Sequence, residues 1–165
     1  VDIINDISAG QIDNKMFDII AKYKIPYIIM HMQGTPENMQ SNPKYNNITD
    51  EVFNFFKEKI KLLKNKGIDD IIIDPGFGFG KTISHNYELL NNLNVFKKLE
   101  KPVLIGVSRK SMIYNISDTN AKNALNGTSI VHTLAILKKV NILRVHDVKE
   151  AMECIKITKF AESIK

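Results

Sequence analysis

Five short apolar runs, each followed by a segment of helical periodicity, constrain the fold of this chain most strongly. The runs are Asp2–Ile4, Tyr27–Met30, Ile71–Ile73, Val103–Val107 and Ile142–Val145. They are dominated by Val, Ile, Leu and Tyr without polar alternation, as is typical of strands buried on both faces of a parallel sheet. Helices are expected between and after them, at about 12–23, 49–66, 86–99, 120–139 and 147–164. The alternation predicts an α/β fold of repeated βα units.

Five such units allow two architectures, an open doubly wound sheet or part of a (β/α)8 barrel, which needs three more strands and roughly 250 residues. Reactive side chains stand at the end of every one of the five runs. They are Asn5, Asp6, His31, Asp74, Ser108, Arg109, Lys110, Arg144 and His146. A barrel collects all its strand ends around one mouth, whereas an open sheet uses only those near its switch point. We therefore predict an incomplete TIM barrel of about five βα units, with residues 1–165 forming part of one domain.

The stretch IIIDPGFGFGKT, from Ile71 to Thr82, looks like a phosphate-binding loop but fails the test of spacing. A P-loop would need glycine where Pro75 stands, and proline offers neither the N–H nor the backbone freedom. The dinucleotide pattern fails as well, because Lys81 occupies the place of its third glycine. What remains is a buried strand that ends in a carboxylate, Asp74, and runs into a glycine-rich turn.

Composition bears on the number of domains, the partners and the location expected for this chain. Its 165 residues, 44% of them hydrophobic, fit one domain with a real core. The net charge of +5 is dispersed, without a basic run interleaved with aromatics, so we expect no nucleic-acid partner. No apolar run is long enough to span a membrane, and Cys154 is the only cysteine, so we expect a cytoplasmic protein with a buried thiol. Because the chain opens on Val1, already within a predicted strand, we expect a piece of a longer gene product.

Cations gather at the ends of the last two strands. They are Arg109, Lys110, Arg144 and His146, with Lys81 nearby. Such a cluster suits a phosphate or a carboxylate. Arg144 and His146 stand two apart, so in a strand they would face the same way. The alternative is that these are solvated surface charges, with Arg144 paired to Asp147 or Glu150 to anchor the last helix.

Uncharged and anionic groups complete the predicted mouth. Asn5 and Asp74 could bind a ring edge, since a carboxylate accepts paired N–H groups, although Asp74 could instead cap the glycine-rich turn. Phe77 and Phe79 could wall a ring pocket or pack in the core. His31 stays open between a structural group and a ligand.

Other chemistries find less support in the sequence. His85 and His132 are interpreted as structural, no Cys/His set has zinc spacing, and no Gly-x-Ser-x-Gly motif is present. The residues alone therefore predict a site for an anion and a flat ring at the mouth of a parallel barrel, without naming a reaction.

Five segments, in this order and spacing, strongly resemble the dihydropteroate synthase family. They are VDIINDISAG, YIIMHMQGTPENMQ, IIIDPGFGFGKTISHNYELL, PVLIGVSRKSMI and LRVHDVKE. The likeness covers essentially the whole chain and corresponds to the region from the fourth barrel strand to the C-terminus. It implies a transferase of folate biosynthesis that condenses (7,8-dihydropterin-6-yl)methyl diphosphate with 4-aminobenzoate, giving 7,8-dihydropteroate and diphosphate.

The resemblance also implies roles for residues around the pterin. Asn5 and Asp74 would bind its edge, and Met30 would belong to its pocket. Lys110 would contact the ring between the two substrates, and Arg109 would stack its guanidinium plane on the pterin.

The remaining roles concern the other substrate groups. Phe79 would line the pocket near the aminobenzoate, Ser111 would contact the benzoate carboxylate, and Gly106 would belong to the substrate-binding set. Arg144 and His146 would form the diphosphate site and, with Lys110, be the catalytic residues. The resemblance further implies a homodimer formed through the C-terminal helices and a target for sulfonamides.

Loops that the family carries before its fourth strand have no counterpart in this chain, among them the one that supplies a Mg²⁺ ligand. Mg²⁺ is therefore expected as a cofactor held by residues outside this chain, with no metal ligand within it. Two alternatives stay open: a related domain that transfers a methyl group from methyltetrahydrofolate, and a fragment or paralogue without activity. The Ser-Arg-Lys-Ser and Arg-x-His segments favour the synthase, because a methyl donor brings no diphosphate to bind.

Overall fold

A computed structural model describes residues 1–13 and 15–164. Position 14, within the first predicted helix, lies outside the described residues. Strands and helices alternate in the order β1 (Ile4–Asp6), α1 (Met16–Tyr23), β2 (Tyr27–Met30), α2 (Ile48–Asn65), β3 (Ile71–Asp74), α3 (Ile83–Asn91), β4 (Leu104–Ile105), α4 (Ser111–Tyr114), α5 (Leu125–Leu137), β5 (Ile142–Leu143) and α6 (Val148–Ser163). Two 3₁₀ segments, η1 (Leu93–Leu99) and η2 (Ala121–Asn123), precede β4 and α5.

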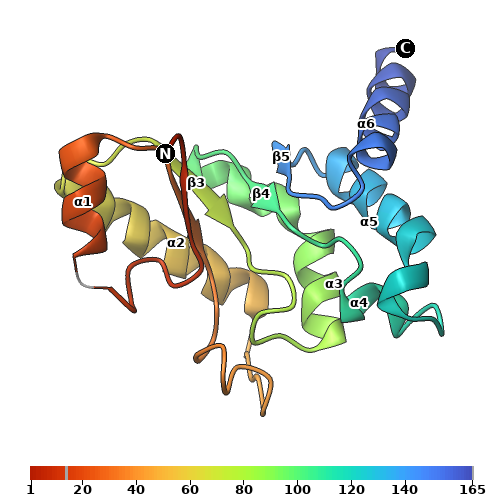
Figure 1. Ribbon diagram of the computed structural model, residues 1–165, viewed down its shortest axis with the longest axis horizontal. Coiled ribbons are helices and arrows are strands. Elements are labelled where there is room, and N and C mark those ends of the chain that lie inside the picture. Colours follow the sequence, from red (N-terminus) through yellow and green to blue (C-terminus); the bar gives the residue numbers. More distant parts are fainter. Residues whose placement is uncertain (14, 165) are drawn as a thin grey trace.

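The strands pair in parallel and in chain order. The β1–β2–β3 sheet and the β4–β5 pair are joined by a bridge between Ile73 and Val103, where the Ile73 N–H donates to the Pro102 carbonyl at 2.9 Å. A doubly wound sheet reverses its strand order at a switch point, whereas this order never reverses (Figure 1). The fold is α/β, and its parallel strands are arranged as in part of a (β/α)8 barrel.

The two faces of the sheet differ in what covers them. Ile29 and Ile73 point into the main core, where they join helix side chains such as Val52 and Phe56. On the opposite face lies a small separate cluster made only of strand residues. It contains Ile28, Ile72 and Leu104, with Ile142 packed against them. In a barrel this second face is the interior, filled by layers of side chains from neighbouring strands.

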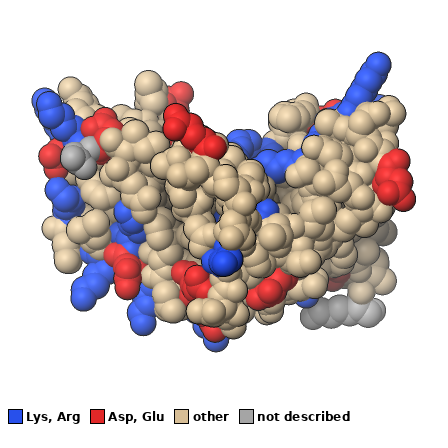
Figure 2. Space-filling model, turned by 90° about the horizontal axis from the view of Figure 1, so that it is seen from below, with Lys and Arg blue, Asp and Glu red and all other residues tan. Residues whose placement is uncertain are grey.

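The C-terminal helices stand at one end of the sheet. In Figure 1, α6 follows β5, packs beside α5 and carries the C-terminus away from the strands. Cys154 is buried on α6, as predicted, with Sγ 3.5 Å from the Ser129 carbonyl on α5. No helix in the described part of the chain is long and apolar enough to cross a bilayer. Figure 2 shows basic and acidic side chains interspersed on one face; the expected lack of a nucleic-acid partner stays a prediction.

Several predicted boundaries were wrong. β1 begins at Ile4, whose N–H donates to the Pro26 carbonyl, so Asn5 and Asp6 lie within the strand and not after it. The helix predicted at 86–99 begins earlier, at Ile83, and ends at Asn91, where the Asn92 N–H is shared between the Glu88 and Leu89 carbonyls and the chain continues as the 3₁₀ segment η1. The helix predicted at 120–139 likewise begins as a separate 3₁₀ turn. β4 and β5 are two residues each, shorter than predicted.

Two glycines with left-handed backbones offer a matched test of the packing around the strand ends. An added Cβ at Gly76 (φ +71°) would lie 2.0 Å from the His31 carbonyl oxygen, whereas one at Gly67 (φ +76°) would meet nothing within 4 Å. We predict that Gly67→Ala lowers the free energy of unfolding by about 1 kcal/mol, from backbone strain alone, and Gly76→Ala by at least about 3 kcal/mol. Denaturant unfolding of the complete gene product measures both. Equal losses would contradict the close approach of the two strand-end loops.

Candidate active site

Strand register brings three of the predicted residues, Met30, Asp74 and Arg144, into one row. Met30 pairs with Asp74 across β2 and β3, and the Arg144 N–H donates to the Ile105 carbonyl at 2.9 Å, which continues the β4–β5 pairing beyond the last strand residue. These residues stand two positions after the interior cluster of Ile28, Ile72 and Ile142, so they face the same side one level higher. Asn5 lies opposite Ile28, one level lower, and is exposed.

A pocket of about 340 Å³ opens at the ends of β4 and β5. Its lining consists of Phe79, Gly106, Ser108, Lys110, Arg144 and His146. All of these were predicted as substrate-binding residues except Ser108, which the sequence placed only among the reactive groups at the strand ends. Ser108 follows Gly106 by two positions at the end of a strand, which is the signal that could have placed it on the same face. Its Oγ accepts a hydrogen bond from the His146 N–H at 3.4 Å.

Asp74 is the buried carboxylate of the site, with a relative exposure of 1%. Its Oδ1 accepts a hydrogen bond from the Gly76 N–H at 2.8 Å, so it does cap the glycine-rich turn. Its Oδ2 lies 3.2 Å from Arg144 Nη2 but has no hydrogen-bond partner among the described residues. Burial raises the pKa of Asp74, against the Gly76 N–H and the charges of Arg144, Lys110 and Lys81. Oδ1 thus caps the turn, and Oδ2, which is paired with Arg144, can still accept a hydrogen bond from a ligand.

Lys110 and Phe79 form one wall of the pocket. The Lys110 ammonium donates to the Phe77 carbonyl at 2.5 Å and lies 4.8 Å from the centroid of the Phe79 ring, within range of a cation–π interaction. Burial lowers the pKa of Lys110 to about 8, although Asp74 acts in the opposite direction. Phe77 is fully buried in the main core. Of the two roles that the sequence left open, Phe79 therefore takes the pocket wall and Phe77 the core.

Lys81 is neither part of the cationic rim that the sequence predicted nor a solvated surface charge. Its side chain is buried, and its ammonium donates to the carbonyls of Phe79 at 2.9 Å and His31 at 3.3 Å. Its Nζ also lies 3.0 Å from His31 Nδ1. Burial lowers the pKa of Lys81 to about 7, and burial together with Lys81 lowers the pKa of His31 to about 3. His31 is thus a neutral ring that packs edge-on against Phe55 and holds Lys81 in place.

Two predicted residues lie beside the pocket lining, and a third lies beneath the glycine-rich turn. Arg109 directs its guanidinium to Asp147 and not towards Phe79 or Arg144, so the predicted stacking on a pterin stays a prediction. Ser111 is exposed and is the first residue of α4, and its contact to a benzoate carboxylate stays a prediction. Met30 is buried, with its Cγ close beneath Gly76.

Asp6, which the sequence grouped with the reactive strand ends, is fully engaged in the structure. Its two oxygens accept hydrogen bonds from the Ser8 N–H and hydroxyl, the Gly10 N–H and the Tyr27 hydroxyl. Burial acts to raise its pKa, but these donors outweigh burial and lower it. Asp6 therefore closes the turn after β1 and leaves no oxygen for a ligand.

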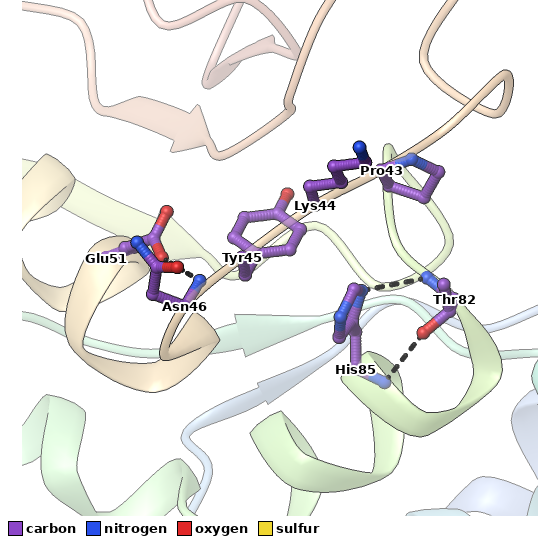
Figure 3. A pocket seen from close by; sticks show the side chains of 7 residues that line it. All are labelled: Pro43, Lys44, Tyr45, Asn46, Glu51, Thr82 and His85. Carbon is purple, nitrogen blue, oxygen red and sulfur yellow. Dashed lines mark hydrogen bonds between the residues drawn. The ribbon is translucent and has the colours of Figure 1, made fainter.

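A second pocket, of about 500 Å³, lies between the segment before α2 and the start of α3 (Figure 3). Thr82 and His85 form a reciprocal cap at the start of α3, and the His85 ring packs edge-on against Tyr45. His85 is therefore structural, as predicted. The pocket contains none of the predicted site residues, so we place the functional site at the strand ends instead.

The fold and the site define a class: a parallel barrel protein that presents a buried carboxylate and a cationic rim at its strand ends. The family of pterin-binding enzymes matches residues 1–146, and the chain belongs to that family. It is 42% identical over 159 residues to the dihydropteroate synthase of Haemophilus influenzae, covering 95% of this chain and 58% of that protein. It is 41% identical over 160 residues to the bifunctional dihydropteroate synthase/dihydropteroate reductase of Helicobacter pylori, covering 97% and 42%.

Solved structures agree with this assignment. A Yersinia pestis dihydropteroate synthase in complex with a sulfonamide drug superimposes with a TM-score of 0.95 at 37% identity, covering 99% of this chain and 60% of that one. The Xanthomonas albilineans enzyme in complex with 7,8-dihydropteroate gives a TM-score of 0.90 at 31% identity, with the same coverage of 99% and 60%. The chain thus spans about half the length of the curated relatives it matches.

The buried Lys81 predicts a pH dependence of stability. Its pKa falls from 10.5 to about 7 on folding, so between these values the unfolded chain holds a proton that the folded chain lacks, and stability rises with pH. We predict that the stability of the wild type relative to Lys81→Met increases by about 2 kcal/mol from pH 7 to pH 9. Denaturant unfolding at both pH values measures it, with Lys57→Met, an exposed lysine on α2, as the control. A pH-independent difference for Lys81→Met would show that this ammonium is not desolvated.

Proposed function

We propose that the complete gene product is a dihydropteroate synthase, which joins (7,8-dihydropterin-6-yl)methyl diphosphate to 4-aminobenzoate. The observation that carries the proposal is Asp74: a carboxylate with 1% exposure whose Oδ2 is ion-paired with Arg144 at 3.2 Å but has no hydrogen-bond donor among the described residues, beside a pocket lined by Lys110 and Arg144. A buried acceptor of this kind is costly unless a ligand satisfies it. The N–H groups at the edge of a pterin ring supply such donors.

The neighbouring residues fit the rest of that substrate. Phe79 offers a flat apolar wall, and Lys110 lies over its ring, so an aromatic ligand can pack against both. Arg144 and His146 line the same pocket and are suited to bind the diphosphate. Pterin and diphosphate would thus be held about the methylene group that joins them.

The proposed reaction is a substitution at that methylene carbon. The amine nitrogen of 4-aminobenzoate forms the new C–N bond, the C–O bond breaks, and its electron pair leaves with the diphosphate while the amine releases a proton to solvent. Arg144 and His146 would stabilise the charge that grows on the leaving group. Methyl transfer from a folate would have no leaving diphosphate for these two residues to bind.

The ligands of the related structures support this assignment: 7,8-dihydropteroate in one and a sulfonamide in the other. We extend both classes of ligand to this protein. Among residues 1–13 and 15–164, no group of three or more His, Cys, Asp or Glu side chains is placed to hold a metal ion. A Mg²⁺ cofactor held by residues outside this chain, like a cytoplasmic location, stays a prediction.

A homodimer is the assembly we propose. Exposed apolar side chains recur along α5 and α6. They are Ile130, Leu134 and Leu137 on α5, and Val148, Met152, Ile157 and Phe160 on α6. The α5 residues follow each other by four and three positions and so share one face of the helix. An apolar surface of this kind on two adjacent helices suits pairing with a second copy about a twofold axis.

Replacement of Asp74 tests the proposed function. We predict that Asp74→Asn weakens binding of the pterin diphosphate by about 2 to 4 kcal/mol and binding of 4-aminobenzoate much less, because an amide can present a donor where the ring edge also presents donors. Phe79→Ala is the complementary variant and should weaken 4-aminobenzoate more. Calorimetry on the complete gene product measures both ligands. Equal weakening of the two by Asp74→Asn would mean that Asp74 serves only its turn.

The proposed dimer has its own test. Ile157→Glu should convert the complete gene product from dimer to monomer in sedimentation velocity at micromolar concentration, because the charge would be buried in the interface. Ile116→Glu, at an exposed apolar position outside α5 and α6, is the matched control and should leave the dimer intact. A wild type that sediments as a monomer would refute the assembly.

A further inference from the structure

Arg109 is held in an unfavourable backbone conformation directly before Lys110. Its φ of +54° lies in the left-handed region, which a residue with a side chain rarely adopts. The Arg109 N–H donates to Thr128 Oγ1 at 3.0 Å, and that hydroxyl donates to the Ala124 carbonyl at 2.8 Å. The start of α5 thus fixes the backbone of Arg109 and sends its side chain away from the pocket.

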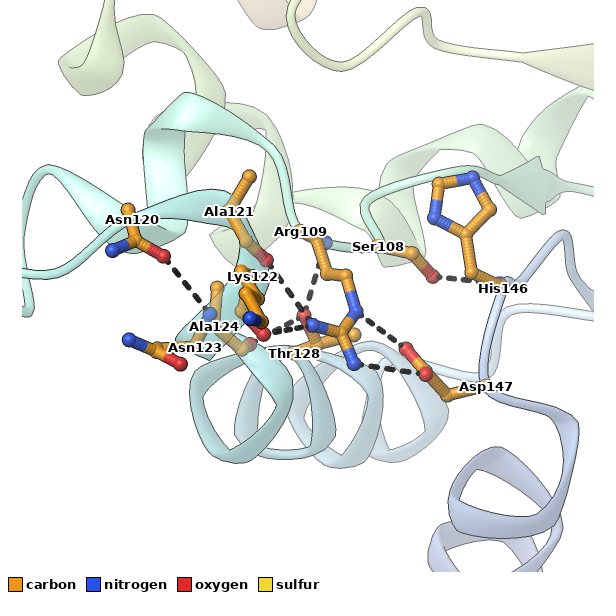
Figure 4. Close-up of polar contacts among 10 residues, drawn as sticks. All are labelled: Ser108, Arg109, Asn120, Ala121, Lys122, Asn123, Ala124, Thr128, His146 and Asp147. Atoms are coloured by element: carbon orange, nitrogen blue, oxygen red, sulfur yellow. Dashed lines mark hydrogen bonds and ion pairs between the residues drawn. The ribbon is translucent and has the colours of Figure 1, made fainter.

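The guanidinium makes a fork-to-fork ion pair with Asp147 (Figure 4). Arg109 Nε donates to Oδ2 and Nη2 to Oδ1, both at 2.9 Å. Nη1 donates to the carbonyls of Ala121 and Lys122. The side chains of Arg109 and Asp147 retain only 23% and 21% exposure, so the pair is largely enclosed. A bidentate pair with further bonds to carbonyls has one defined geometry, unlike a solvated surface ion pair.

Asp147 binds Arg109 and does not cap its own helix. It occupies the N-cap position of α6, where an aspartate normally accepts a hydrogen bond from the first turn of the helix. Here its side chain makes no such bond and turns to Arg109 instead. The carboxylate therefore joins two loops and does not cap its helix.

The two loops carry opposite sides of the pocket. Arg109 immediately precedes Lys110, and Asp147 immediately follows His146. The Ser108–His146 hydrogen bond is a second link between the same loops, one position earlier on each. A shift of either loop would move Lys110 relative to Arg144 and His146.

We propose that Arg109 and Asp147 are a positioning pair, which fixes the loop of Lys110 against the loop of Arg144 and His146. Arg109 then acts through Asp147 and does not itself touch the substrate. This inference rests on the proposed function, since it assigns Lys110 to the pterin and the other two residues to the diphosphate. Small displacements of positioned groups are costly, so the pair affects binding without contacting a ligand.

The test uses the complete gene product and inorganic diphosphate as the probe. We expect Asp147→Asn to weaken diphosphate binding about 10-fold or more and to lower kcat with the pterin diphosphate. Arg109→Lys should do the same, because lysine keeps the charge but not the fork. The double variant should be no worse than either single variant. Glu162→Gln is the matched control, since it removes an ion pair between α6 and Lys139, neither member of which lines the pocket, and it should leave diphosphate affinity unchanged.

Other outcomes would overturn the inference. If Arg109 contacts the substrate directly, Arg109→Lys and Asp147→Asn will have additive effects. If the pair only stabilises the fold, both variants will lower the melting temperature and leave diphosphate affinity and kcat at wild-type values. A wild type that binds neither diphosphate nor the pterin ester would overturn the proposed function and this inference with it. Binding by the wild type that is unchanged in Asp147→Asn would overturn the positioning pair alone.

Discussion

Parallel pairing in register is the constraint on which the rest of this structure depends. Met30 stands opposite Asp74, and Arg144 continues the pairing of β5 with β4 through the Ile105 carbonyl. Because side chains alternate between faces, this register sends Asp74 and Arg144 to the interior side, one level beyond the apolar layer of Ile28 and Ile72. A slip of one residue in any strand would move its functional side chain into the helix-packed core. The site is thus specified by the same hydrogen bonds that build the sheet.

The charged side chains of the site are arranged around one buried carboxylate, that of Asp74. Three cations, Lys81, Lys110 and Arg144, act on Asp74, and each reaches it from a different segment. Two of them also bind carbonyls of the glycine-rich turn: Lys110 that of Phe77 and Lys81 that of Phe79. The charges and the turn are therefore coupled, because Lys110 and Lys81, which offset the negative charge of Asp74, also hold the turn that carries Phe79. Of these three cations, Lys110 and Arg144 line the pocket, while Lys81 is buried and does not.

Local sequence patterns predicted much of the fold but only part of the site. The apolar runs of β2 and β3 were located nearly to the residue, because strands buried on both faces have an unambiguous composition. The presence of reactive groups at strand ends correctly favoured a barrel. The sequence could not show that the Tyr27 hydroxyl binds Asp6, or that Lys81 folds inward onto His31, because those partners come from other segments. Arg109 was assigned to a pterin by family likeness, and its pairing with Asp147 depends on a left-handed backbone that no motif reveals.

Gly106 has a consequence for inhibition of this site. A Cβ there would lie 2.6 Å from Arg144 Nη2, so the guanidinium lies directly against bare backbone. Even the smallest substitution at this position would displace the arginine that the proposed reaction uses on its leaving group. A compound that packed against Arg144 beside Gly106 could therefore not be excluded by a substitution of Gly106 without loss of activity, because any side chain there would also displace Arg144. In pharmacological terms, resistance through substitution of Gly106 would be hard to select.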